Sequence, residues 1–223
     1  MSLLVRAITS SPEGPAPGGL LSFEVNGITV WASALADEHP PFTRDDVLEN
    51  HRLVSEIFAV VRACLPVRFP SEVDDVAAID AARFAPDLER VRDACELAVT
   101  AAWRPPFQQS TPPVTANTPG RRYLQQRQVN VHLRERAERL AQEIVETVGT
   151  SLLEESTTVC PSEKVALSLA LLVRRAEAEG VKSRIPRTAQ DVRILINGPW
   201  PPYTFAAVRL DHTHGRGTGG AQA

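Results

Sequence analysis

Long hydrophobic runs and aromatic residues are both scarce in this sequence of 223 residues, in which aromatic residues make up 5%. No window approaches the roughly 18 apolar residues of a membrane-spanning helix. The first residues also lack the apolar core of a secretory signal peptide. We therefore expect a chain that crosses no membrane and remains in the cytoplasm.

Cysteine is also rare. The three cysteines, Cys64, Cys95 and Cys160, are odd in number, far apart in sequence, and form no CxxC pair. This spacing argues against a disulfide framework and against a zinc site. We predict buried free thiols, no metal and no cofactor.

A large excess of charge of one sign is lacking too, because the chain has 24 basic and 27 acidic residues and a formal net charge of -3. Such a balance provides no strong field for nucleic acid or an anionic membrane. An arginine-rich stretch from Arg121 to Arg139 leaves nucleic-acid binding open as an alternative. Glutamates interrupt the second part of that stretch, which favours an ordinary charged helix face.

Familiar catalytic motifs are missing: the sequence has no GxSxG elbow, no Walker loop and no HExxH pair. His212 and His214 lie near Asp211 in a glycine-rich tail, which is more typical of a loose terminus than of a metal site. His51 falls on the apolar stripe of a predicted helix. A metal- or nucleotide-dependent enzyme using His51 and nearby acids remains the alternative to a packed histidine.

The first half of the chain alternates strand and helix patterns. Asn26-Gly27 between two apolar runs predicts a β-hairpin, and Thr43 predicts the cap of a helix that ends near Cys64. The full set of predicted elements is strands at 3–8, 20–25, 28–35, 65–69 and 97–103, and helices at 43–64, from Ser71, and from Pro86 to Cys95.

The second half begins after a proline-rich stretch, residues 105–120, that reads as a linker. A long helix is predicted over 121–148, with Gly149 placed to end it. The remaining predictions are strands at 152–159, 164–173 (which also fits a helix), 192–196 and 203–210, and a short helix at 174–182. We therefore predict an α+β fold with domains at 1–104 and 121–210, each a mixed sheet with helices, and a disordered tail at 211–223.

The most unusual segment is Gly-Pro-Trp-Pro-Pro-Tyr-Thr-Phe, residues 198–205, here named the signature segment. Its prolines fix φ and remove backbone donors, so the rings of Trp200, Tyr203 and Phe205 are held by a stiff backbone. The rings either plug a core or form a pre-organised surface for a partner, and both can hold at once.

This segment closely resembles the C-terminal signature of the gas vesicle protein F/L family. The matching residues are Gly198, Pro199, Trp200, Pro201, Pro202, Tyr203 and Phe205. Three further matches follow the order of the family's motifs. They are His51 with Leu65, Pro66, Arg68 and Phe69; Gly120, Tyr123 and Leu124 at the start of the long helix; and Leu171 to Arg174.

The resemblance implies a two-domain α+β protein whose C-terminal domain has a modified ferredoxin-like fold. It also implies a non-enzymatic accessory role in gas vesicle formation, without a cofactor. The implied partners are the small hydrophobic shell protein of the GvpA type and other accessory proteins. A shell subunit with a very apolar face aggregates unless something covers it, and a soluble partner with rigid aromatic anchors suits that task.

Overall fold

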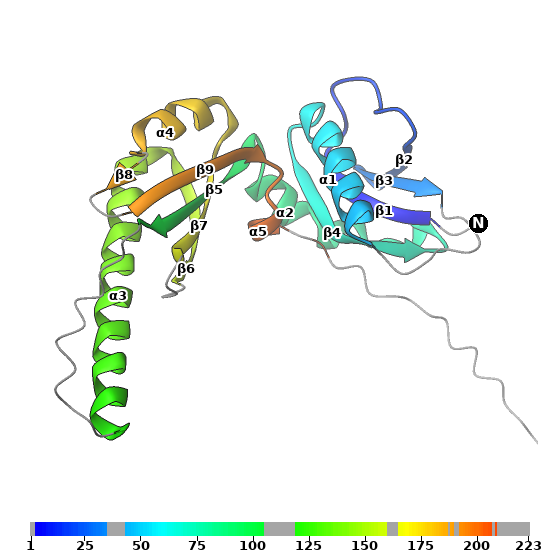
Figure 1. Cartoon of the computed structure of the whole chain (residues 1–223). Helices are drawn as coiled ribbons and strands as arrows, with labels where there is room; N and C mark the ends of the chain where they lie inside the picture. The colour runs from blue at the N-terminus through cyan, green and yellow to red at the C-terminus, as the bar shows by residue number, and fades with distance from the viewer. Residues whose placement is uncertain are drawn as a thin grey trace, which may run out of the picture. The chain divides into compact units, whose positions relative to one another are not determined.

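The structure is a computed structural model that describes residues 3–34, 43–104, 119–159, 165–186, 188–189, 192–206 and 208. The chain forms two compact units (Figure 1). Unit 1 comprises residues 1–92 and 201–223, and unit 2 comprises residues 93–200. Most of the predicted linker, the tail and Cys160 lie outside the described residues.

Unit 1 is built on a four-stranded sheet in the order β2-β3-β1-β4. The strands are β1 (Leu3–Thr9), β2 (Leu21–Val25), β3 (Ile28–Ala34) and β4 (Cys64–Val73). Asn26 and Gly27 have φ angles of 46° and 86°, which the tight turn of a two-residue hairpin requires. The predicted hairpin is confirmed, as are the strands around residues 3–8 and 65–69.

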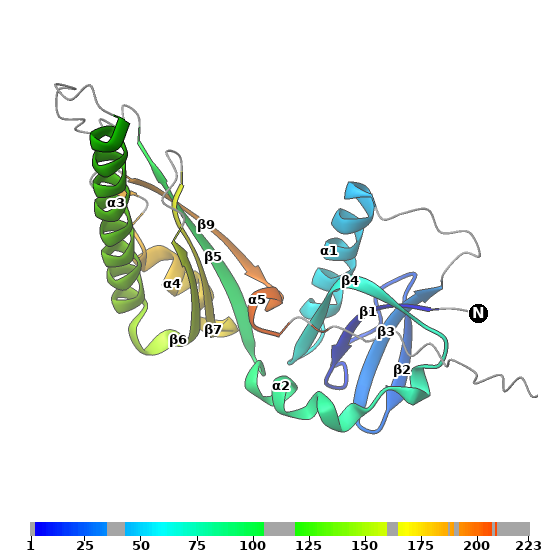
Figure 2. The ribbon, with the colours of Figure 1, turned by 90° about the horizontal axis from the view of Figure 1, so that it is seen from below.

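Helix α1 (Arg44–Ala59) packs against β1 and β4. It begins with a capping box, in which Thr43 and Asp46 each accept a hydrogen bond from the other's backbone N–H. The opposite side of the sheet is covered by two 3-10 turns (Val76–Ala78 and Ala81–Arg83), α2 (Ala85–Arg90) and α5 (Tyr203–Ala206), whose apolar residues share a core with the strands (Figure 2).

Four local predictions were wrong. The helix predicted from Pro86 to Cys95 ends at Arg90, and Cys95 lies in a strand, Ala94–Trp103. Ser71 does not open a helix, because it lies in β4 and pairs with Val5 of β1. Helix α1 ends at Ala59, short of Cys64, where β4 already begins. The segment from Tyr203 forms a short helix instead of a strand.

Unit 2 is a five-stranded sheet in the order β6-β7-β5-β9-β8. Its elements are β5 (Ala94–Trp103), α3 (Pro119–Val148), a 3-10 turn (Gly149–Ser151), β6 (Leu152–Val159), β7 (Val165–Arg174), a 3-10 turn (Arg175–Glu177), α4 (Ala178–Arg184), β8 (Thr188–Ala189) and β9 (Val192–Trp200). Without β8, the order β-α-β-β-α-β and the sheet order 2-3-1-4 define a ferredoxin-like arrangement, modified by one extra short strand.

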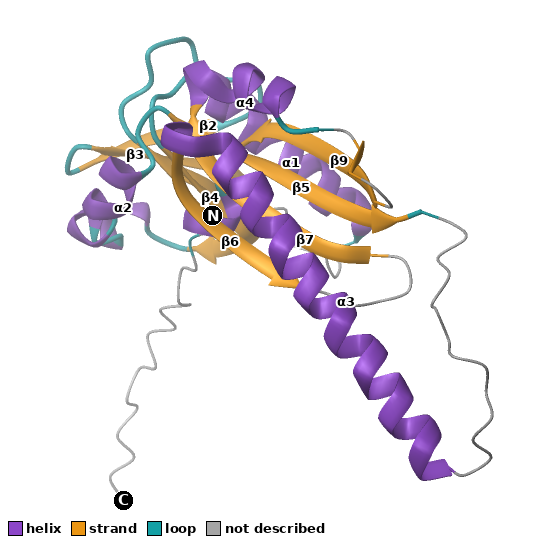
Figure 3. Ribbon diagram, turned by 90° about the vertical axis from the view of Figure 1, so that its left-hand side faces the viewer, coloured by secondary structure: helices purple, strands orange, loops and turns teal. Residues whose placement is uncertain are grey.

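Helix α3 packs on β6 and β7 through the residues that its apolar stripe predicts. Leu133, Ala137, Leu140, Ile144 and Val148 are all buried. The helix has 30 residues, about 45 Å at 1.5 Å per residue, and its first half runs on past the strands (Figure 3). Among the described residues, no helix is both long enough and apolar enough to cross a membrane.

The units differ from the predicted bounds in two places. β5 lies at the centre of the second sheet, between β7 and β9, although the sequence pattern assigned it to the first domain. Residues 201–208 belong to unit 1, although they follow the last strand of unit 2. The strand pairs within both described sheets are antiparallel and not mixed, and an isolated parallel bridge joins Val67 to Val208.

Candidate functional site

The signature segment begins inside β9, at a bulge opposite β5. Trp200 is the register partner of Glu96 and Asn197 that of Ala98, so the shift falls at Gly198 and Pro199, whose peptide bond is cis. Gly198 has a φ of +113°, and a Cβ there would lie 2.6 Å from the carbonyl oxygen of Glu96. Only glycine fits this position without displacing backbone.

A lysine from α4 holds the same turn. The Nζ of Lys182 donates to the carbonyl oxygen of Gly198 at 3.0 Å and lies 2.8 Å from the Oε1 of Glu179. The Lys182 side chain is 18% exposed, so this charge-assisted hydrogen bond is shielded from much of the solvent. The exposed Pro199 and the half-buried Trp200 follow directly on this fixed carbonyl.

Pro201 and Pro202 start helix α5. Both prolines are buried, and their carbonyl oxygens accept hydrogen bonds from backbone N–H groups two and four residues further along the chain. Tyr203 donates to Pro201 at 2.8 Å, and Ala206 donates to Pro202 at 2.9 Å. Proline suits the start of a helix, where its missing donor is not needed. The prolines therefore nucleate a helical turn and direct the ring of Tyr203.

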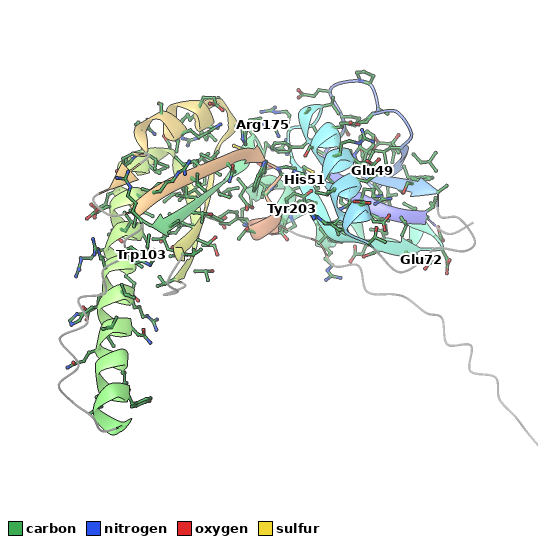
Figure 4. All side chains as sticks on the ribbon, in the orientation of Figure 1. Glu49, His51, Glu72, Trp103, Arg175 and Tyr203 are labelled. Carbon is green, nitrogen blue, oxygen red and sulfur yellow. The ribbon has the colours of Figure 1, made fainter. Side chains whose placement is uncertain are left out.

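Tyr203 contacts His51 of α1, which is 152 residues away in sequence (Figure 4). The Tyr203 hydroxyl lies 3.3 Å from the Nδ1 of His51, and the two ring centroids are 5.7 Å apart. Both side chains are half-buried. The contact joins the first and last family-like motifs of the chain and packs the ring of His51 against that of Tyr203.

The residues just after the segment are attached to β4, which contains the Leu-Pro-Val-Arg-Phe motif. Val208 donates its N–H to the carbonyl oxygen of Pro66 at 3.0 Å. Ala206 and Val208 share the core of unit 1 with Leu65, and the Nη2 of Arg90 donates to the carbonyl oxygen of Phe205 at 2.8 Å. Two of the predicted motifs, the signature segment and the match formed by His51 with Leu65 to Phe69, therefore supply contacts to one region of unit 1.

Sequence reasoning missed a buried polar network beside this region. Asn50, 3% exposed, donates from Nδ2 to the carbonyl oxygen of Val67 at 3.1 Å and accepts a hydrogen bond from Arg6 at 3.1 Å. Arg6 also donates to the hydroxyl of Ser33. Burial lowers the pKa of the Arg6 guanidinium, against the opposing effect of Glu49 and then Asp46.

The remaining predicted residues lie elsewhere. Gly120, Tyr123 and Leu124 are in the first turns of α3, where the side chains of Tyr123 and Leu124 are 66% and 58% exposed. Arg68 and Phe69 lie in β4, and their side chains are outside what the structure describes.

The potential metal ligands and nucleophiles of the described residues include two cysteines. No group of three or more metal-ligating side chains occurs there. Cys64 and Cys95 are buried free thiols, as predicted. Burial raises the pKa of the Cys95 thiol to about 11, against the opposing effect of Arg175 and Lys182. Cys95 therefore remains protonated near neutral pH and is a poor nucleophile.

The fold and the junction of motifs define an α+β protein of two antiparallel-sheet units. The family model for gas vesicle synthesis protein GvpL/GvpF matches residues 5–207. The chain belongs to this family, which ties it to gas vesicle formation. The family is one of gas vesicle accessory proteins and is not a known enzyme family.

Two solved structures share the fold. The crystal structure of the gas vesicle protein GvpF from Anabaena sp. PCC7120 is 18% identical, with a TM-score of 0.73, and the match covers 94% of this chain and 99% of that one. GvpF from Microcystis aeruginosa is 14% identical, with a TM-score of 0.71 and coverage of 93% and 99%. No curated protein matches the chain. The predicted α+β fold is confirmed.

Proposed function

We propose that this protein is a non-enzymatic assembly factor that binds the hydrophobic gas vesicle shell protein and other accessory proteins while vesicles form. The observation that carries the proposal is the family match over residues 5–207. Its place of action is the cytoplasm, in association with growing vesicles.

The signature segment is the proposed contact region. In unit 2, Lys182 holds the carbonyl oxygen of Gly198; in unit 1, Val208, just after the segment, donates to Pro66. Trp200 in unit 2 is partly exposed, as are Tyr203 and Phe205 in unit 1. Aromatic side chains that lose little conformational freedom on binding are typical of interaction hot spots.

Co-expression with a GvpA-type shell protein, followed by affinity capture of the tagged full chain, tests the proposal. We expect the wild-type chain to retain the shell protein, and the variants Trp200→Ala and Phe205→Ala to retain at least about tenfold less, the effect of a modest hot spot. Leu153→Ser is the matched control, because Leu153 is 40% exposed on strand β6, outside the segment.

Circular dichroism separates a lost contact from a lost fold. Variants that keep the wild-type spectrum but release the shell protein support a binding role for the rings. Variants that stay folded and retain the shell protein as wild type does would refute it. Absence of any capture by the wild-type chain, when another accessory protein captures the shell protein in parallel, would contradict the proposal itself.

A further inference from the structure

Four strands lie at the edges of the two sheets, and three of them have features that discourage pairing with another chain. β8 has two residues and β2 has five, so both offer little backbone. β4 contains Pro66 and Pro70, and Val208 forms a bridge to it at Val67. The fourth edge strand is β6, at the border of the sheet in unit 2 (Figure 3).

Strand β6 lacks these features. It has eight residues, none of which is proline, lysine or arginine, and positions 155–158 are all exposed. Its register with β7 is unbroken from Glu154 to Val159, and its one irregularity lies at its first residues. No strand among those described pairs with its other side. A further strand can therefore add to the sheet at this edge through backbone hydrogen bonds.

The side chains of β6 are complementary to those of a second β6 that runs in the opposite direction. Glu154 and Glu155 carry carboxylates, which only accept hydrogen bonds, and Thr157 and Thr158 carry hydroxyls, which can donate them. An antiparallel pair centred on Ser156 places each glutamate opposite a threonine, 154 opposite 158 and 155 opposite 157. Within the described part of the chain, the side chains of Glu155, Thr157 and Thr158 make no other bond that would compete.

We propose that β6 pairs with β6 of a second copy of this chain, antiparallel and centred on Ser156, so that the two sheets join into one. Other registers are less favourable. A pair centred on Glu155 brings that carboxylate opposite itself, a pair centred on Thr157 leaves Glu155 opposite Val159, and a parallel pair in register places like charges together. The proposed contact is isologous and closed, so association ends at a dimer.

This dimer is weak, because the pairing of two single strands buries less than the roughly 1,200 Å² of a stable interface. Main-chain hydrogen bonds provide the affinity, and the opposed glutamates and threonines select the direction and the register. The inference does not depend on shell-protein binding, because β6 lies outside the signature segment and its test uses this chain alone.

Sedimentation velocity on the full chain, over a range of concentrations and without shell protein, tests the proposal. We expect the wild-type average mass to rise with concentration from the 24.3 kDa of one chain toward twice that mass, and not beyond it. Ser156→Glu and Ser156→Lys each place like charges opposite one another at the two-fold axis. Each variant alone should therefore associate at least about tenfold more weakly than wild type, with an unchanged circular dichroism spectrum.

An equimolar mixture of the two Ser156 variants is the decisive sample. Glutamate on one copy then lies opposite lysine on the other, and association should return to within about threefold of wild type. Only a residue that meets its own copy at the axis gives this pattern. Ser22→Glu and Ser22→Lys are the matched controls, because Ser22 is an exposed serine on the edge strand β2. Both should associate as wild type does.

Three results would overturn the proposal. The first is a wild-type chain that stays monomeric at every concentration; if the Ser156 variants then fail to capture the shell protein, the edge of β6 serves that protein instead of a second copy. The second is a mixture that associates no better than either Ser156 variant alone. The third is a rescue that occurs for a mixture of Thr157→Glu and Thr157→Lys but not for the Ser156 variants, because the pair is then centred on Thr157.

Discussion

The signature segment and the start of α3 both carry family-like motifs, but their surroundings differ. The end of the signature segment is bonded to His51 and Arg90 of unit 1, and Val208, just after it, is bonded to Pro66. The start of α3 presents Tyr123 and Leu124 to solvent. Resemblance to a family motif therefore does not tell whether the residues of the motif serve packing within the fold or recognition of a partner.

Because their surroundings differ, the two segments should also differ in how much a substitution lowers the free energy of unfolding. Substitutions in the constrained turn displace backbone or leave buried polar groups without partners, and these are the mechanisms of large stability losses. Substitutions in an exposed helix face remove few native contacts. Stability measurements along both segments therefore test the comparison directly.

The largest effect is expected for Gly198→Ala. The added Cβ would meet the Glu96 carbonyl oxygen at 2.6 Å, in a backbone conformation with φ of +113°. We expect a loss of at least about 2 kcal/mol in the free energy of unfolding, from strain and displaced backbone together. Urea denaturation followed by circular dichroism measures it.

Two glycines serve as matched controls for that substitution. Gly27 has a φ of +86° but no atom within 4 Å of its added Cβ, and Gly18 has neither constraint. We expect Gly27→Ala to cost about 1 kcal/mol and Gly18→Ala close to nothing. If all three substitutions cost the same, close packing at Gly198 is not what the turn requires.

The second-largest loss of stability is expected at Asn50, which bonds the strand β4 beside the signature segment. Asn50→Ala removes the donor to the Val67 carbonyl oxygen and the acceptor for Arg6. A buried polar group left without its partner costs about 1–3 kcal/mol, so we expect a loss in that range by urea denaturation. Gln128→Ala, at an exposed position of α3, is the control. An equal loss in both variants would contradict a structural role for the Asn50 network.

A smaller effect is expected for Tyr203→Phe, which keeps the ring and removes the hydroxyl 3.3 Å from His51. One partly exposed hydrogen bond contributes about 1 kcal/mol, so the loss should not exceed that. A double-mutant cycle with His51→Ala measures the coupling of the two side chains. A coupling energy of zero would mean that they are neighbours without a stabilising contact.

Local chemistry made several elements predictable. The Asn26-Gly27 hairpin, the Thr43 cap and the apolar stripe of α3 each depend on residues close together in sequence. The errors came from distant pairing. Ser71 continues β4 because β1 pairs with it, and β5 belongs to unit 2 because β7 and β9 flank it.

The candidate site was predictable as a list of residues but not as an arrangement. The rings of the signature segment stood out by composition, whereas nothing local shows that Tyr203 meets His51. One feature of the sequence could have indicated the buried Asn50: it is a polar residue that interrupts the apolar stripe of α1 between Val47 and Val54. Its partners, Arg6 and the Val67 carbonyl, come from two different strands, so only the folded chain identifies them.

The smallest effect on stability is expected at the exposed start of α3. Leu124→Ser changes a side chain that is 58% exposed in α3, and surface substitutions of this kind stay within about 0.5 kcal/mol. Leu195→Ser, at a side chain that is 44% exposed in β9, is the control and should cost as little. A stability loss at Leu124 as large as that at Gly198 would show that the start of α3 packs as part of the fold, and the contrast between the two motifs would disappear.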